Sequence, residues 1–187
     1  AEIFTEHGEL ANREVRTVQV DAVFSDKGAH THFMSKEIHE QPSVATYALS
    51  HYVDAESGAI SGTAQAVDFS EVDRVVMVAC GTAFYACAVA KYWFEQVARL
   101  PVEIDIASEF RYRAPPVGSR DLALFVSQSG ETADTLAALR YCADEGATIV
   151  SIINAAESRI ARESEEALTI HAGAEIGVAS TKAITKQ

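Results

Sequence analysis

The chain has 187 residues, of which 48% are hydrophobic and 22% charged, and this balance is typical of a globular protein with one real core and a small appendage. Its formal net charge of -12 argues against DNA, RNA or an anionic membrane surface as a partner, because those partners require a positive field. An anionic small ligand must therefore be bound by local groups.

Cysteine content and hydropathy indicate a compartment. Cys80, Cys87 and Cys142 have neither the pairing of a disulfide framework nor the spacing of a zinc site, so we expect packing residues in a reducing cytoplasm. No apolar run approaches the length of a membrane span, and no signal peptide pattern opens the sequence. Because the chain begins at Ala1 and ends without a helix stop, we expect it to be part of a longer protein.

Few helices and strands are predicted in the first seventy residues. Residues 14–24 (EVRTVQVDAVF) indicate one strand. The stretch from Thr31 predicts a helix up to Gln41 and then a second helix, which Pro42 opens in its first turn. We therefore expect three parts. They are a remnant of another domain with a linker (1–31), a helical lead-in (32–68) and the main domain (69–187).

From Glu71 onward, short apolar runs alternate with helical patterns. This alternation predicts an α/β fold in which helices flank a doubly wound, parallel, five-stranded sheet. Between the first two runs, an apolar helix face is predicted from Phe84, Cys87, Ala90, Phe94 and Val97. The second run alternates with acidic residues, which favours an edge position. The expected strands are 75–80, 102–107, 122–127, 148–153 and 167–172.

Two strand-to-helix junctions carry small polar residues, at 78–83 (VACGTA) and at 125–132 (FVSQSGET). In an open parallel sheet, ligands bind beyond the carboxyl ends of the strands, where helix N-termini present unpaired N–H groups. Such groups, together with hydroxyls, suit a phosphate, and no lysine or arginine lies between Asp121 and Leu139. We therefore predict a phosphate cradle without a cation. Its side chains would be Ser127, Gln128, Ser129 and Thr132, with Thr82 from the other junction.

Simpler interpretations compete with this one. Ser129 and Thr132 could merely cap a helix, which is worth about 1 kcal/mol, but four donors within six residues exceed the needs of one cap. Glu131 and Asp134 suit a first helical turn, and we expect both carboxylates to face away from the ligand. We predict no metal site, since no cysteine or carboxylate set completes a coordination shell around the N-terminal histidines, which are His30, His32 and His39.

Four motifs follow one another in a specific order: "ACGTA", "SEFRYR", "SQSGETADTL" and "EIGVASTKA", preceded by "SKEIHEQP". Together they resemble the first sugar isomerase (SIS) domain of the glutamine:fructose-6-phosphate amidotransferase (glucosamine-6-phosphate synthase) family. The resemblance implies a flavodoxin-like SIS fold and an enzyme that converts fructose 6-phosphate and glutamine into glucosamine 6-phosphate and glutamate. It assigns the phosphate to the 127–132 loop and Thr82, and the sugar to Val178 and Ser180. Ala83 stands where the family usually has serine.

The same resemblance implies that the catalytic groups lie in a glutaminase domain and a second SIS domain, which are not among these residues. It also implies a homodimer, and we expect no catalytic residue in this chain and no cofactor. Two alternatives stay open. One is a non-catalytic phosphosugar-binding SIS module. The other is a single-domain phosphosugar isomerase, which would need its own base, and Glu175 is the candidate.

Overall fold

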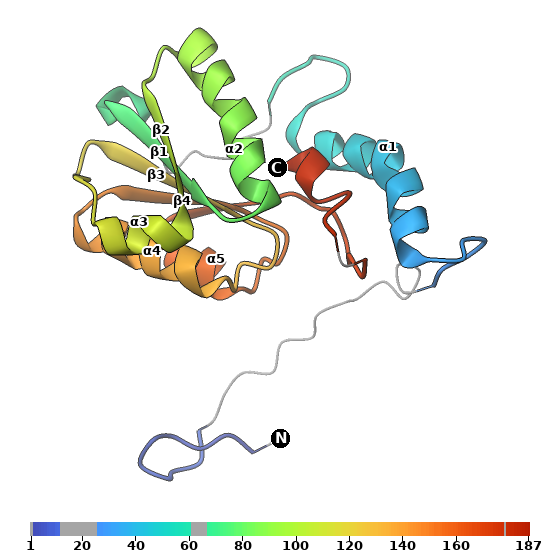
Figure 1. Cartoon of the computed structure of the whole chain (residues 1–187), viewed down its shortest axis with the longest axis horizontal. Helices are drawn as coiled ribbons and strands as arrows, with labels where there is room; N and C mark the ends of the chain where they lie inside the picture. The colour runs from blue at the N-terminus through green and yellow to red at the C-terminus, as the bar shows by residue number, and fades with distance from the viewer. Residues whose placement is uncertain (1, 12–25, 61–66, 178) are drawn as a thin grey trace.

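Five parallel strands form the centre of the fold, in the order β2-β1-β3-β4-β5 (Figure 1). The computed structural model describes residues 2–11, 26–60, 67–177 and 179–187, so the predicted strand at 14–24 lies outside the described residues. The parallel α/β sheet and the edge position of β2 are confirmed. The strands are β1 (Arg74–Ala79), β2 (Val102–Ile106), β3 (Asp121–Ser127), β4 (Thr148–Ile153) and β5 (Glu166–Thr169).

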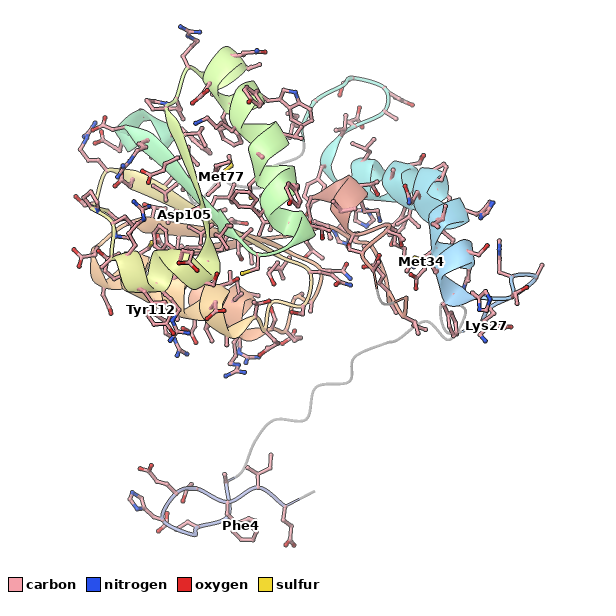
Figure 2. All side chains as sticks on the ribbon, viewed as in Figure 1. Phe4, Lys27, Met34, Met77, Asp105 and Tyr112 are labelled. Carbon is pink, nitrogen blue, oxygen red and sulfur yellow. The ribbon has the colours of Figure 1, made fainter. Side chains whose placement is uncertain are left out.

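Helices cover both faces of this sheet, so its strands are apolar on both sides, as buried parallel strands are. Met77 of β1 packs under α2 (Thr82–Trp93), and Figure 2 shows it between the strand and that helix. The neighbouring Val78 faces the opposite layer and packs in one cluster with Phe110. That layer consists of α3 (Ala107–Arg113), α4 (Ala133–Asp144) and α5 (Arg159–Glu163).

The end of the predicted apolar helix differs from expectation. Phe84, Ala90 and Phe94 pack against the core as predicted, but Val97 is 84% exposed, so its assignment to the buried face is wrong. After α2 the backbone widens into a π-helical turn, Phe94–Ala98 (η3). The wider turn rotates later side chains away from the 3.6-residue stripe, which carries Val97 into solvent.

The predicted helix break at Pro42 is also wrong, because α1 (Phe33–Tyr52) runs through it. A proline inside a helix costs about 3 kcal/mol, since it removes a donor and crowds the preceding turn. Here Glu37 is buried before the proline, and Val44 and Ala48 are buried after it. Both halves of the helix therefore pack on the rest of the molecule, and this packing outweighs the local preference.

The C-terminal segment fills the space between α1 and α2 (Figure 1). The predicted strand 167–172 is shorter than expected, because the backbone reaches a left-handed conformation at His171 (φ 50°). After this strand, Ile184–Lys186 form a short 3-10 turn (η4).

Two of the three cysteines are packing residues, as predicted. Cys87 and Cys142 are free and buried, and burial raises the pKa of each thiol to about 12. Cys80 is partly buried against the core. Among the described residues, no helix combines the length and the apolar character needed to cross a membrane.

Candidate functional site

The candidate site lies where β1 and β3 end side by side. From β1 the chain passes into α2 on one face of the sheet, and from β3 into α4 on the other face. Ligands of doubly wound folds bind at this kind of switch point. A cleft of about 440 Å³ occupies it. Its lining is Cys80, Gly81, Thr82, Ala83, Val126, Ser127, Gln128, Ser129, Thr132, Thr135, Ala179, Ser180 and Gln187.

One wall of the cleft is the beginning of α2. Gly81 is the N-cap residue, with φ 60° and ψ -133°, a conformation that disfavours a side chain although a Cβ added there would have no other atom within 4 Å. Thr82 and Ala83 follow in the first helical turn, where backbone N–H groups have no partner in the helix. Thr82 is exposed and Ala83 is 6% exposed. This wall therefore offers N–H groups and one hydroxyl.

The opposite wall is the 127–132 loop, which is held largely by its own hydroxyls. Ser127 Oγ accepts a hydrogen bond from the Gly130 N–H at 3.1 Å and lies 3.4 Å from Thr132 Oγ1. Ser129 Oγ accepts from the Glu131 N–H at 3.2 Å. Thr132 is the N-cap residue of α4, yet its side chain makes no capping hydrogen bond. The helix-cap interpretation therefore does not account for the Thr132 hydroxyl.

Gly130 fixes the position of this loop against the start of α5. Its φ is 64°, and an added Cβ would lie 2.0 Å from Ser158 Oγ. Its carbonyl accepts from the Ile160 N–H at 3.1 Å, and the carbonyl of Gln128 accepts from the Asn154 N–H at 3.2 Å. The loop is thus anchored to the segment after β4 by its backbone, which leaves side chains toward the cleft.

Thr135 is a site residue that the sequence reasoning missed. It lines the cleft, it is 1% exposed, and its Oγ1 has no hydrogen-bond partner within the described part of the chain. Buried hydroxyls are normally paired, so an unpaired one beside a cleft marks a position that a ligand or water can fill. The available signal was its spacing, because Thr132 and Thr135 are three residues apart at the start of one helix.

Charge around the cleft is arranged as the sequence suggested. Among the described lining residues, Cys80 is the one with an ionisable side chain. Glu131 accepts from the backbone N–H of Arg159 at 2.8 Å and from its side chain at 2.7 Å, and these hydrogen bonds lower the pKa of the Glu131 carboxyl. Asp134 is paired with Arg111 at 2.8 Å. Both carboxylates are therefore held by arginines outside the cleft.

No set of three or more metal-ligating side chains occurs in residues 2–11, 26–60, 67–177 and 179–187. His30 and His39 lie near each other, with ring centroids 5.2 Å apart, but their Nδ1 atoms contact Ser35. Both histidines therefore make contacts at the start of α1.

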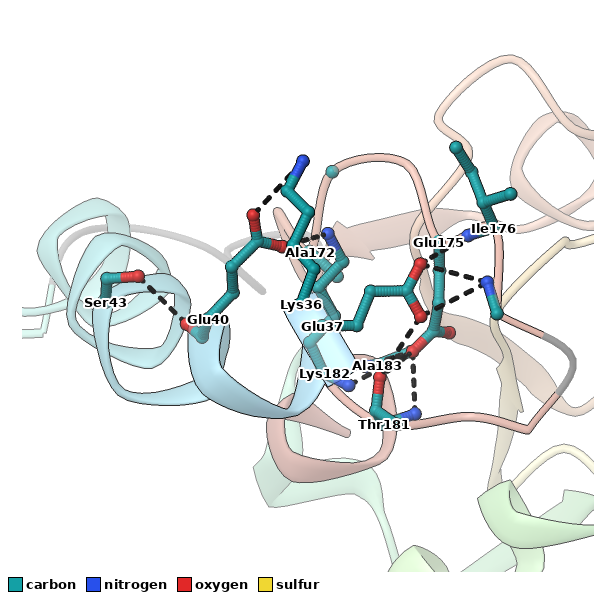
Figure 3. Close-up of polar contacts among 12 residues, drawn as sticks. Lys36, Glu37, Glu40, Ser43, Ala172, Glu175, Ile176, Thr181, Lys182 and Ala183 are labelled. Carbon is teal, nitrogen blue, oxygen red and sulfur yellow. Dashed lines mark hydrogen bonds and ion pairs between the residues drawn. The ribbon is translucent and has the colours of Figure 1, made fainter. Parts of the chain in front are cut away.

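The third wall comes from the segment after β5. Ala179 and Ser180 line the cleft, whereas Val178 lies outside the described residues. Glu175 does not line the cleft. Its Oε1 accepts from the Thr181 N–H at 2.7 Å, the Lys182 N–H at 3.0 Å and Thr181 Oγ1 at 2.9 Å (Figure 3). Glu175 therefore acts as an anchor for the turn that follows Ser180.

Comparisons with known proteins identify the family of this fold. The model of the SIS domain family matches residues 68–187. The glutamine–fructose-6-phosphate aminotransferase (isomerizing) of Brucella abortus is 54% identical over 185 residues, which are 99% of this chain and 30% of that protein. The Agrobacterium fabrum protein of the same name is 54% identical over 187 residues and 31% of its length. The chain thus spans less than one third of these relatives.

A solved structure has the same fold. The C-terminal domain of glucosamine-fructose-6-phosphate aminotransferase from Francisella tularensis superimposes with a TM-score of 0.81 at 41% identity. The match covers 86% of this chain and 45% of that one.

Proposed function

This chain belongs to the SIS domain family, and from that premise we propose that it is the sugar-phosphate-binding part of a glutamine–fructose-6-phosphate aminotransferase. Such an enzyme would convert fructose 6-phosphate and glutamine into glucosamine 6-phosphate and glutamate. The observation that carries the proposal is the cleft at the ends of β1 and β3, where hydroxyls and helix N-termini converge without a charged side chain among the described lining residues.

The phosphate is proposed to bind at the 127–132 loop. Ser127, Ser129 and Thr132 offer hydroxyls there, Gln128 offers an amide, and the N-terminus of α4 carries about half a positive charge. Each hydrogen bond to a charged group contributes about 1.5 to 3 kcal/mol, so three or four of them can replace a lysine. Thr82 is proposed to complete the cradle from the α2 wall.

The sugar is proposed to lie against the segment that contains Val178 and Ser180. Ser180 faces the same cleft as the phosphate loop, which supports this assignment. At position 83 the alanine cannot donate a hydrogen bond, so we propose that the ligand is held by one hydrogen bond fewer there than in relatives with serine.

The chemistry is proposed to reside in other parts of a longer polypeptide, a glutaminase domain and a second SIS domain. Supporting this, the matched relatives are more than three times as long as the chain. Glu175 is a poor candidate for an isomerase base in this chain, because its Oε1 is occupied by the turn that it anchors. We accordingly place no catalytic residue in these 187 residues and no cofactor.

A homodimer in the cytoplasm is the proposed setting. The outer face of α2 presents Tyr85, Val89, Tyr92 and Trp93, each more than half exposed. Four large exposed apolar side chains on one helix face are typical of a surface that another molecule covers, and a second copy of the chain is the commonest partner. Sedimentation that finds only monomers at high protein concentration would contradict this part of the proposal.

Calorimetric titration and a product assay test the function. The chain should bind fructose 6-phosphate but form no glucosamine 6-phosphate from glutamine or ammonia, whereas the longer polypeptide that contains it should form the product. Binding with no product from the longer polypeptide would favour a non-catalytic phosphosugar module. Product from the chain alone would favour a single-domain isomerase and would make Glu175 the first base to replace.

A further inference from the structure

Glu37 is a buried carboxylate that α1 directs toward a segment 140 residues away in the sequence (Figure 3). It is only 2% exposed. Its Oε1 accepts from the Ile176 N–H at 2.6 Å and from the Gly177 N–H at 3.0 Å, and its Oε2 lies 3.2 Å from the same Gly177 nitrogen. A buried carboxylate is costly unless hydrogen bonds satisfy it, so these contacts fix both the side chain and the two peptide groups.

Gly177 is shaped to receive this carboxylate. Its φ is not in the left-handed region, so the backbone conformation alone does not require glycine. A Cβ at this position would lie 2.5 Å from Glu37 Oε2 and 3.0 Å from the terminal methyl carbon of Met34. Figure 2 labels Met34 where α1 meets the C-terminal segment. The glycine is therefore explained by the close approach of α1.

Glu175 holds the other end of the same short segment through the N–H groups of Thr181 and Lys182. Thr181 Oγ1 lies between the two carboxylates, 2.9 Å from Glu175 Oε1 and 3.5 Å from Glu37 Oε2. The segment is thus fixed on both sides of Ala179 and Ser180, the residues that face the cleft.

Positive charge is supplied next to this pair of carboxylates by an ion-pair chain. The Lys182 side chain is 1% exposed and pairs with Glu40 at 3.1 Å, and Glu40 also pairs with Lys36 at 3.5 Å. Glu40 follows Glu37 by three residues on α1, so both acidic side chains lie on one face of that helix. The first turns of α1 therefore contact the C-terminal segment through charges and hydrogen bonds.

From this geometry we infer that Glu37 is a positioning residue for Ala179 and Ser180, the cleft-lining residues of the segment 176–180. The lead-in helix α1 then belongs to the sugar-phosphate site, although it precedes the residues 68–187 that match the family model. The inference rests on the proposed function, because it assigns the sugar to the segment that Glu37 holds. Glu37 acts through Ile176 and Gly177 and does not touch the ligand.

Two ligands separate this role from a general structural one. Fructose 6-phosphate uses both the phosphate loop and the 176–180 segment, whereas inorganic phosphate uses the loop alone. Glu37→Gln keeps the size of the side chain and one acceptor but turns charge-assisted hydrogen bonds into neutral ones. It is expected to lower the affinity for fructose 6-phosphate about 5- to 10-fold. Glu37→Ala should lower this affinity more than about 10-fold. Inorganic phosphate should bind all variants equally in calorimetric titration.

Glu56→Gln is the matched control, because it makes the same change on an exposed carboxylate outside α1.

A double-mutant cycle with Gly177 is a second test. Gly177→Ala should strongly lower the affinity for fructose 6-phosphate in the unsubstituted chain, where the new Cβ would contact the Glu37 carboxylate. The loss should be much smaller in the Glu37→Ala background, because that carboxylate is absent there.

Each outcome decides a different claim. If the unsubstituted chain binds neither fructose 6-phosphate nor inorganic phosphate, the proposed function itself is refuted. If the unsubstituted chain binds fructose 6-phosphate and both Glu37 variants bind it equally well, the function stands and the inference is wrong. Equal losses for fructose 6-phosphate and inorganic phosphate in Glu37→Gln would also overturn it, because Glu37 would then support the fold as a whole. Should Glu37→Ala fail to fold, the Glu37→Gln result decides.

Discussion

Replacing Thr132 by valine separates phosphate binding from helix capping. The two side chains have nearly the same shape, so the change removes a hydroxyl and little else. That hydroxyl makes no capping bond to α4, and its one described contact is Ser127 Oγ at 3.4 Å. The expected loss in the free energy of unfolding is therefore below about 0.5 kcal/mol, whereas the loss of a working cap would cost about 1 kcal/mol or more.

The expected effect on binding is much larger. A hydroxyl that donates to a sugar phosphate makes a hydrogen bond to a charged group, which is worth about 1.5 to 3 kcal/mol. Since about 1.4 kcal/mol corresponds to a tenfold change in affinity, Thr132→Val should lower the affinity for fructose 6-phosphate roughly 10- to 100-fold. Unphosphorylated fructose does not use this bond, so its affinity should stay the same.

Calorimetric titration of both sugars and thermal unfolding of the same samples measure the two effects. Thr46→Val is the matched control, because Thr46 is exposed on α1 and its Oγ1 donates to the Pro42 carbonyl, away from the cleft. The reasoning is refuted if Thr132→Val lowers the unfolding temperature by several degrees while both sugars lose affinity equally. Thr132 would then shape the helix start and would not hold the phosphate.

Three further changes test other parts of the molecule. In denaturant unfolding, Gly130→Ala should lower the unfolding free energy by about 2 to 4 kcal/mol, because it adds backbone strain and displaces Ser158. Gly58→Ala is the control, since Gly58 also has a positive φ but open space around it, and it should cost only about 1 to 2 kcal/mol. Cys80 should be the thiol that iodoacetamide modifies at mildly alkaline pH, as followed by mass spectrometry, and fructose 6-phosphate should slow the modification because Cys80 lines the cleft. Burial lowers the pKa of His171 below its unfolded value of 6.5, so the unfolded chain binds that proton more tightly and stability falls as the pH drops below about 6.5. His171→Asn, which suits the left-handed backbone, should reduce this fall between about pH 7.5 and 5.5 in thermal unfolding; an unchanged slope would exclude His171 as its source.

The strands and their parallel arrangement could be predicted because they depend on local patterns. Runs such as Leu122 to Val126 are apolar on both faces, and only a sheet covered by helices on both sides buries them. The clustering of the 127–132 loop residues at one cleft was predictable for a related reason. The hydroxyls and the glycine of this loop and the end of β3 lie within six residues, so their proximity in space follows from their proximity in sequence.

Features that depend on distant contacts could not be predicted in this way. The local preference of Pro42 favours a helix break, and only the burial of residues on both sides of it explains the continuous helix. The exposure of Val97 depends on a π-helical turn, which has no simple sequence signature. Only its spacing from Thr132 marks Thr135 in the sequence, because whether its hydroxyl finds a partner is decided by the surrounding packing.

Glu37 is the clearest case of such a distant contact, and it changes how the boundary of the domain should be understood. The match to the family model begins at residue 68, close to the first strand. The segment proposed to face the sugar, however, follows the last strand, and its described residues belong to no strand. Glu37 of α1 instead holds the N–H groups of Ile176 and Gly177, and Glu175 holds the N–H group of Thr181, directly after the segment. A cut placed between α1 and β1 would keep the whole sheet and the phosphate loop intact. It would leave the N–H groups of Ile176 and Gly177 without their partner, so phosphate binding would survive such a cut better than sugar binding.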